Sequence, residues 1–291
     1  MHTIKLIKML AHDIIVVDDL PERIQSSIVN KAINYALISL AFTHRKLDFI
    51  KLENRIQNMT KGKIAELIFQ YFMVQNQLKV NFSSCKTPFY LPNKRDFLMN
   101  EYEWDLKNNF IRTTHILSGE QMLELPALIP NRPSSMYFTD QWEKRLEMKH
   151  STSKGLRFVF TFMERPPNKD FIDLTAHPSL GNFFLRIKKD FPFKSKEEPP
   201  FTQSWFWNEM SKVDFPVYQI NQELRLYITA WAGQEQFSLF HNDGKRNFKR
   251  YIYTRIRNKT IEIYRLPAFS TLFTNLKKDI TKLLYDKGYI L

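Results

Sequence analysis

Two aspartates and a lysine follow one another in the segment DFLMNEYEWDLKNN, which runs from Asp96 to Asn109. Eight residues separate Asp96 from Asp105, and Lys107 stands two positions after Asp105. If the segment forms a hairpin, the two carboxylates come close together and repel each other unless a cation lies between them. Mg²⁺ suits such a place because it binds carboxylate, water and phosphate oxygens. The segment therefore indicates metal-assisted chemistry at a phosphate, with Lys107 placed to act on a water or on the phosphate.

Two strands would have to position these groups. The stretches RDFLMN and YEWDLKNNF are short and bounded by turn residues, which predicts a hairpin with its turn near Asn100. Side chains alternate along a strand, so Asp105 and Lys107 project from one face, whereas Trp104 and Leu106 project from the other. The apolar face predicts that the hairpin is attached to a core.

A helix just upstream offers a third carboxylate. We expect it to run from Lys61 to Gln75, with Thr60 as its N-cap. The stretch KIAELIFQYFMV is apolar in nearly every direction of a helical wheel and leaves Glu66 and Gln70 as one narrow polar stripe. A helix that is apolar almost all round is usually buried, so Glu66 would lie near the core beside a cation. Alternatively, the stripe marks the solvent-facing edge of the helix.

The helix with Glu66, the strand with Asp96 and the Asp-Leu-Lys run at 105–107 together resemble the active-site signature of the PD-(D/E)XK nuclease superfamily. This superfamily includes most type II restriction endonucleases. Its first acid lies at an end of one strand, its second acid and lysine lie on the next strand, and a helix just upstream often supplies a glutamate. The resemblance covers residues 60–110, and Arg95 stands where the family name has proline.

The resemblance implies a restriction-endonuclease-like core with a mixed central sheet flanked by helices. It also implies that Asp96, Asp105 and Glu66 bind Mg²⁺, and that these acids and Lys107 are the catalytic residues. The alternative is an exposed hairpin with ordinary surface charges, since an isolated Asp-x-Lys sequence is common by chance.

The charge balance points to a polyanionic partner. The chain has 43 Lys and Arg against 30 Asp and Glu, a net charge of +13, and the last 51 residues hold twelve basic and four acidic residues. We expect the partner to be double-stranded DNA. A generally lysine-rich proteome and an anionic membrane are alternative explanations, although no basic amphipathic helix stands out.

Basic and aromatic residues are interleaved between His241 and Lys259. Asn242-Asp243-Gly244 predicts a turn, and the alternation after Arg250 predicts a strand. Its basic face either contacts the DNA backbone or is a solvated edge. The residues that we expect at DNA are Lys245, Arg246, Lys249, Arg250, Arg255 and Arg257.

The remaining pattern of helices and strands indicates an α/β fold with a mixed sheet, although α+β is possible. We divide the chain into a helical region (1–57), a catalytic core (58–165) and a C-terminal basic, DNA-contacting region (166–291), which is either separate from the core or integrated with it. Further helices are predicted within 20–57 and at 141–149, 201–210 and 270–286, and further strands at 79–83, 136–140, 156–163, 223–231 and 249–266.

Several classes of protein are disfavoured. A single cysteine, Cys85, excludes an internal disulfide and a cysteine-based zinc site, and the scattered glycines form no phosphate-binding loop. No run of 18 apolar residues occurs, and the N-terminus lacks a signal-peptide pattern. We therefore expect a soluble cytoplasmic protein with no membrane association and no nucleotide cofactor.

The function that these features favour is Mg²⁺-dependent hydrolysis of phosphodiester bonds in double-stranded DNA by a sequence-specific endonuclease of the type II restriction class. One hairpin gives one active site, so cutting both strands at a symmetric target predicts a homodimer. The alternatives are a non-catalytic DNA-binding protein whose acidic hairpin is incidental, and a nuclease of repair or junction processing.

Overall fold

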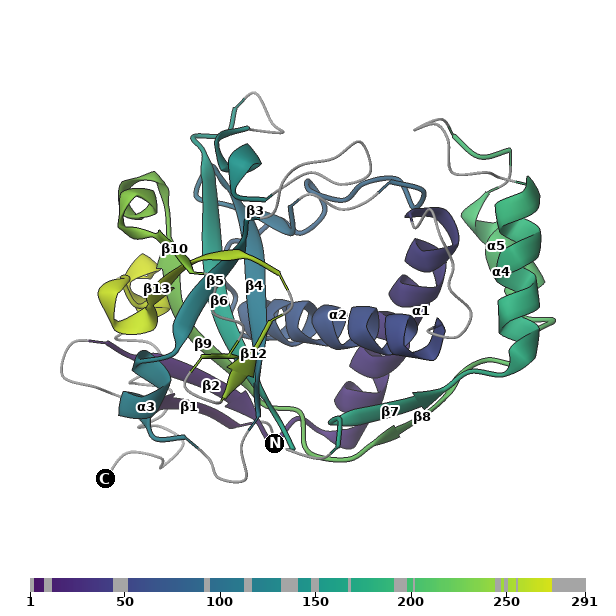
Figure 1. Ribbon diagram of the computed structural model, residues 1–291, viewed down its shortest axis with the longest axis horizontal. Coiled ribbons are helices and arrows are strands. Elements are labelled where there is room, and N and C mark those ends of the chain that lie inside the picture. The colour runs from purple at the N-terminus through teal and green to yellow at the C-terminus, as the bar shows by residue number, and fades with distance from the viewer. Residues whose placement is uncertain are drawn as a thin grey trace.

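A mixed sheet of six strands forms the centre of the molecule, in the spatial order β1-β2-β9-β6-β4-β3 (Figure 1). β4 and β6 run parallel, and every other neighbouring pair is antiparallel. The strands are β1 (Thr3–Ile7), β2 (Ile14–Asp18), β3 (Phe97–Met99), β4 (Tyr102–Arg112), β6 (Leu156–Arg165) and β9 (Leu226–Ala232). The computed structural model describes residues 3–7, 12–43, 52–91, 95–112, 117–131, 141–147, 152–166, 169–190, 198–200, 202–243, 247–248, 251–254 and 256–273.

Two long helices, α1 (Glu22–Thr43) and α2 (Leu52–Gln75), cover one face of this sheet. Trp104 and Leu106 of β4 point toward them and are buried in the same apolar core. The ring of Phe69 on α2 stacks on Phe97 of β3 with centroids 5.3 Å apart. The predicted attachment of the hairpin to the core through its apolar face is therefore confirmed.

A smaller sheet with the order β10-β13-β5 lies on the other face. Its strands pack against Phe158, Phe160 and Phe162 of β6, so the central sheet separates two apolar cores. The predicted α/β class with a mixed central sheet is confirmed. Other elements on this side are β5 (Pro126–Pro130), β10 (His241–Asp243), β13 (Asn258–Glu262), the short helix α3 (Gly119–Leu123), and 3-10 helices at Glu143–Leu146, Gln234–Leu239 and Ile263–Arg265. A further 3-10 helix, Phe269–Leu272, lies on the side of the long helices, where Phe269 contacts Phe69 of α2.

A two-stranded ribbon carries two more helices to the side of α1 (Figure 1). The ribbon is β7 (Ile172–Thr175) with β8 (Val217–Ile220), and the helices between them are α4 (Pro178–Asp190) and α5 (Gln203–Met210). Phe206 of α5 holds them in place, because its ring lies 5.6 Å from the rings of Phe42 on α1 and Phe183 on α4.

The structure corrects two predicted boundaries near the hairpin. α2 begins at Leu52, so Thr60 is an inner residue of the helix with a buried side chain, not an N-cap. Leu52 and Ile56 extend the buried stripe of α2 by more than two turns, which outweighs the weak capping signal. The predicted strand at 79–83 is wrong as well, since only Asn81 forms a bridge, with Leu98.

For the other elements of the chain, some predictions agree with the structure and others do not. The predictions of β6, β9 and α5 are confirmed. Of the predicted helix 141–149, the described residues 141–147 contain only the 3-10 helix Glu143–Leu146, and the strands β1 and β2 occupy part of the region expected to be helical. The predicted strand at 136–140 lies outside the described residues, as does the helix 270–286 beyond residue 273. The division into three regions stays a prediction, and its first boundary falls within α2.

The predicted single strand over 249–266 is interrupted. β12 (Ile252–Tyr253) pairs with β11 (Asn247–Phe248), and β13 begins only at Asn258. The Asn258 side-chain amide donates hydrogen bonds to the Thr254 hydroxyl and the Ile256 carbonyl, which fixes a bend between the strands. No helix within the described ranges is long and apolar enough to cross a membrane.

Candidate active site

The hairpin that carries the acidic residues has the geometry expected from its sequence. Met99 and Tyr102 are paired, so Asn100 and Glu101 form a two-residue turn between β3 and β4. Both have positive φ angles, 52° and 65°, as a primed hairpin turn requires. The turn sets the register that brings the start of β3 beside the middle of β4.

Asp96 directly precedes β3, which is an edge strand of the central sheet. Its backbone N–H donates to the Trp104 carbonyl over 2.9 Å, and its Oδ2 accepts the N–H of Leu106 over 2.7 Å. The carboxylate thus accepts the backbone N–H of a β4 residue that lies beyond the part of β4 paired with β3. This bond holds Asp96 beside Asp105.

Asp96 lies close to two other negatively charged side chains. Its pKa is raised well above the usual value for an aspartate, first by burial and then by the negative charges of Glu66 and Asp105. The hydrogen bond from Leu106 and the positive charge of Lys107 act in the opposite direction without cancelling the rise. Both of the other carboxylates proposed from the sequence, Glu66 and Asp105, therefore act on Asp96.

Asp105 and Lys107 form an ion pair across one face of β4. Lys107 Nζ lies 2.6 Å from Asp105 Oδ2, and both side chains are largely buried. The ammonium group also lies 5.3 Å from the ring centroid of Phe158, which belongs to the core opposite the long helices. Asp105 and Lys107 therefore share a face, as the alternation predicted.

Glu66 has a partner that the sequence reading did not single out. Lys63, one helical turn earlier on α2, pairs with Glu66 and lies 4.5 Å from the ring centroid of Tyr35 on α1. Burial alone would lower the pKa of Lys63, but the Glu66 carboxylate outweighs it and leaves that pKa raised. Burial, followed by Glu66, also raises the pKa of Tyr35. The i,i+3 spacing of Lys63 and Glu66 was the available signal.

Arg95, at the position of the family's proline, neutralises a different carboxylate. Glu103 is fully buried, and its Oε2 lies 3.2 Å from Arg95 Nε. The same guanidinium donates to the carbonyl of Glu147 over 2.9 Å. This pairing leaves Asp96 and Asp105 as the acids at the end of the hairpin that are not matched by Arg95.

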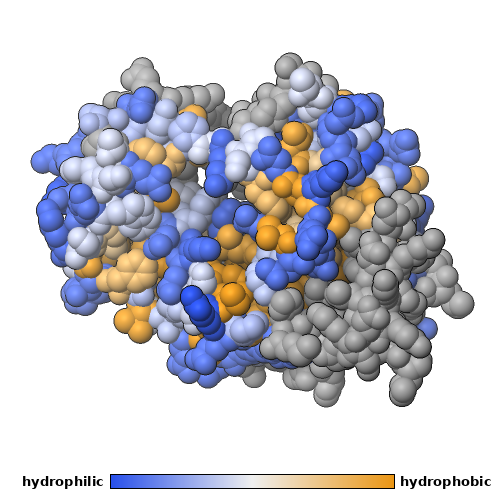
Figure 2. All heavy atoms as spheres, turned by 180° about the vertical axis from the view of Figure 1, so that it is seen from behind, coloured by the Kyte–Doolittle hydropathy of each residue, from blue (hydrophilic) through white to orange (hydrophobic). Residues whose placement is uncertain are grey.

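A pocket of about 550 Å³ opens beside these residues, between α1, α2, the segment 82–91 and α5. Figure 2 shows the molecule hollowed between a lobe built on α4 and α5 and a lobe built on the central sheet. Glu66, Asp96 and Leu106 belong to the pocket lining. Four basic residues also line it: Lys31, Lys63, Lys86 and Arg95.

The donor set can be tested against a divalent cation. Among the residues that the structure describes, no three His, Cys, Asp or Glu side chains are grouped closely enough to hold a metal ion. All donors at the hairpin are carboxylate oxygens, however, and the repulsion that raises the pKa of Asp96 is what a divalent cation relieves. The residues fit Mg²⁺ by charge and donor type, provided that Asp105 exchanges its Lys107 partner for the cation.

The structure describes only one of the six residues predicted to contact DNA. Lys245, Arg246, Lys249, Arg250 and Arg255 lie outside the described residues. Arg257 is exposed and stands in the bend before β13, where its carbonyl accepts the N–H of Asn131 over 2.9 Å. Its predicted place on a continuous strand face is wrong.

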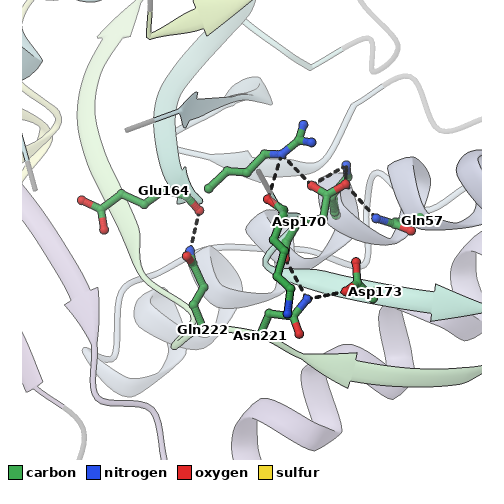
Figure 3. Close-up of polar contacts among 9 residues, drawn as sticks. Gln57, Glu164, Asp170, Asp173, Asn221 and Gln222 are labelled. Atoms are coloured by element: carbon green, nitrogen blue, oxygen red, sulfur yellow. Dashed lines mark hydrogen bonds and ion pairs between the residues drawn. The ribbon is translucent and has the colours of Figure 1, made fainter. Parts of the chain in front are cut away.

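A second polar cluster lies near the other end of β6, and Figure 3 shows its contacts. Asp170 is its centre and accepts bonds from Lys61 at 3.1 Å and Gln57 at 2.7 Å, both from α2. Arg165 Nε lies 2.9 Å from the same carboxylate. Asn221 bridges the Asp170 carbonyl to the Asp173 carboxylate, so the cluster ties α2 to the ribbon of β7 and β8.

Comparisons of the chain with protein-family models, with curated proteins and with solved structures found no match. The assignment of a function therefore depends on the residues and their geometry.

Proposed function

We propose that this protein is a Mg²⁺-dependent endonuclease that hydrolyses phosphodiester bonds of double-stranded DNA, with a restriction-endonuclease-like core and sequence specificity of the type II kind. The observation that carries the proposal is the carboxylate Asp96, whose pKa is raised by burial and then by Glu66 and Asp105, at the end of a hairpin that also holds Lys107. A carboxylate that has a raised pKa and lines a pocket, as Asp96 does, is typical of a functional site.

Asp96, Asp105 and Glu66 would hold the cation. Bound there, Mg²⁺ would supply neutralising charge for the phosphate and a lower pKa for an attacking water. Lys107 is the cation of the chain itself at this site, 2.6 Å from Asp105 Oδ2. With Asp105 bound to a cation, Lys107 would be available to position the attacking water or to stabilise charge developing on the phosphate.

The surroundings also favour a phosphate. The pocket beside the acids is lined by four basic side chains, and the whole chain carries a net charge of +13. Positive charge near a carboxylate pair draws in a polyanion that the carboxylates alone would repel. These features support nucleic acid over a small neutral substrate.

One observation favours the runner-up, a DNA-binding protein without catalysis. Asp105 already has a cationic partner in Lys107, and such an ion pair is neutral without a metal. The two functions differ in their dependence on divalent cations, because binding persists without them whereas hydrolysis does not.

The test is digestion of a sequenced plasmid by the purified protein in Mg²⁺ and in EDTA, followed by mapping of the ends. We expect cleavage in Mg²⁺ at defined sites and none in EDTA. Equal cleavage in both, or none in either with undiminished binding, contradicts the proposed chemistry. Comparing plain duplex with branched DNA separates the restriction function from repair or junction processing.

Cation binding has a readout that does not depend on cleavage. Mg²⁺ should raise the Tm of the protein without DNA, because a ligand that binds only the folded chain stabilises it. The Asp105→Asn variant should lose this rise. Sedimentation of that variant on a duplex in Mg²⁺ should show the two chains per DNA that a symmetric cut requires, whereas a single chain points to a nicking enzyme.

A further inference from the structure

The pocket beside the acids has a composition that catalysis at a phosphate does not need. Partly exposed aromatic rings from three parts of the chain contribute to its wall. Tyr35 comes from α1, Phe82 and Phe89 from the segment after α2, and Trp207 from α5. All four are half-buried, so each ring keeps part of its surface open.

Amide side chains are distributed among these rings. Asn34 on α1, Gln70 on α2 and Gln203 on α5 line the same pocket. An amide offers both a donor and an acceptor, which is the pattern needed to recognise the edge of a nucleobase. Asn34 and Gln203 are exposed, so their amides are accessible to a ligand that enters the pocket.

The pocket therefore combines two kinds of group in one space. Its carboxylates and basic side chains suit a cation and a phosphate, and its aromatic rings and amide groups suit a base. A nucleotide has the same two parts, a phosphate and a base. The volume of about 550 Å³ falls within the usual range for pockets that enclose a ligand of this size.

We propose that this pocket receives a nucleobase extruded from the DNA next to the scissile phosphate. The inference rests on the proposed function and adds that the substrate is read as an unpaired nucleotide. Enzymes that act on extruded bases stack them on aromatic side chains and recognise their paired edge by hydrogen bonds. Tyr35, Phe82, Phe89 and Trp207 supply the stacking surfaces, and the amides supply the edge contacts.

The test compares two DNA duplexes that differ by one bulged nucleotide, with binding measured by fluorescence anisotropy in EDTA so that nothing is cut. A bulged base has already lost its pairing, so the protein does not have to unpair it. We expect the bulged duplex to bind roughly tenfold or more tightly than the paired duplex. Equal affinity for the two duplexes overturns the proposal.

Trp207 and its neighbour provide a matched pair of variants. Trp205 and Trp207 are both half-buried on α5 and both pack against the core, but only Trp207 lines the pocket. Trp207→Leu should weaken binding of the bulged duplex about five-fold to a hundred-fold, the usual effect of removing a stacking ring, and abolish the preference. Trp205→Leu should keep the preference. A preference that survives Trp207→Leu, or that both variants lose equally, contradicts the assignment.

A second variant avoids the core altogether. Gln203 is exposed at the first position of α5, and the helix cap bond from Trp205 N–H to the Thr202 hydroxyl does not involve its side chain. Gln203→Ala should therefore fold normally and reduce the differences in affinity among duplexes that bulge each of the four bases. Unchanged discrimination argues against an edge contact.

These results can be told apart from a failure of the nuclease proposal. A protein that cuts only with Mg²⁺ but binds both duplexes equally retains the proposed function and loses the base pocket. A protein that prefers the bulged duplex but never cuts in Mg²⁺ retains the pocket and loses the catalytic role of the hairpin.

Discussion

Two carboxylates at opposite ends of the sheet have opposite surroundings, although α2 contacts both. Asp170 is held by Lys61, Arg165 and Gln57, so its charge and its hydrogen-bonding capacity are met within the chain. Asp96 accepts a backbone N–H, and its pKa is raised first by burial and then by two more acids. The first arrangement stabilises the fold, whereas the second lowers its stability because negative charges are held close together.

The difference teaches how to distinguish structural from functional charge in this molecule. A carboxylate matched by cations needs nothing from solution, and removing it leaves buried positive charge behind. A carboxylate crowded by others is relieved by a cation from outside. Changes at the two places should therefore differ in sign as well as in kind.

The largest expected effect is on cleavage. Asp105→Asn keeps the shape of the side chain and removes its charge, and we expect cleavage to fall about a thousandfold or more, since a bound cation stabilises the transition state by several kcal/mol. Lys107→Ala should cause a comparable loss. Binding should persist or improve after Asp105→Asn, because a negative charge near the phosphates is gone. Normal cleavage by Asp105→Asn in Mg²⁺ removes the hairpin from the mechanism.

The next effect is on stability at the other cluster. Asp170→Ala leaves Lys61, whose side chain is 6% exposed, without its carboxylate, and should lower the free energy of unfolding by about 3 kcal/mol. Urea denaturation measures this loss. Asp173→Ala is the matched control, because Asp173 is exposed and should change stability by only about 0.5 kcal/mol. Equal losses for the two variants mean that Asp170 has no special structural role.

A smaller effect of opposite sign is expected at Asp96. Because its pKa is raised in the folded state, Asp96 binds a proton more tightly when folded, and its favourable contribution is lost as pH rises from the unfolded pKa near 3.8 through the folded value. Asp96→Asn removes this titration and keeps an oxygen for the Leu106 N–H. The variant should have a higher Tm than the wild type at neutral pH, and the difference should shrink toward pH 4. A variant less stable at pH 7 contradicts the description of Asp96 as a strained acid.

The smallest effect separates the active site from general attraction to DNA. If Arg257 contacts a phosphate, Arg257→Ala should flatten the slope of log affinity against log salt by about 0.9, and changing Arg255 as well should double the effect. Arg265→Ala, an exposed arginine beside Glu262, serves as the control. An unchanged slope after Arg257→Ala excludes the contact, and relaxed preference at a single base pair indicates a base contact instead.

Local features were predicted where a short stretch of sequence contains its own cause. The turn at Asn100, the alternation from Trp104 to Lys107 and the strands β6 and β9 follow from nearest-neighbour patterns, and the structure has them. The N-cap at Thr60 failed because burial of the preceding turns extends α2, which no capping signal reveals. The prediction of a strand through 249–266 failed because side-chain hydrogen bonds form a bend in a stretch of strand-forming residues.

The candidate site divides in the same way. The sequence by itself determined that Asp105 and Lys107 share a strand face and that Asp96 lies one hairpin away, because strand periodicity and turn length fix both. Only the tertiary structure decided that Glu66 affects Asp96, that Arg95 pairs with Glu103, and that α5 closes the pocket with Trp207. These contacts join residues far apart in the chain or on different elements. Their distances depend on how helices pack on the sheet, and no local periodicity encodes that packing.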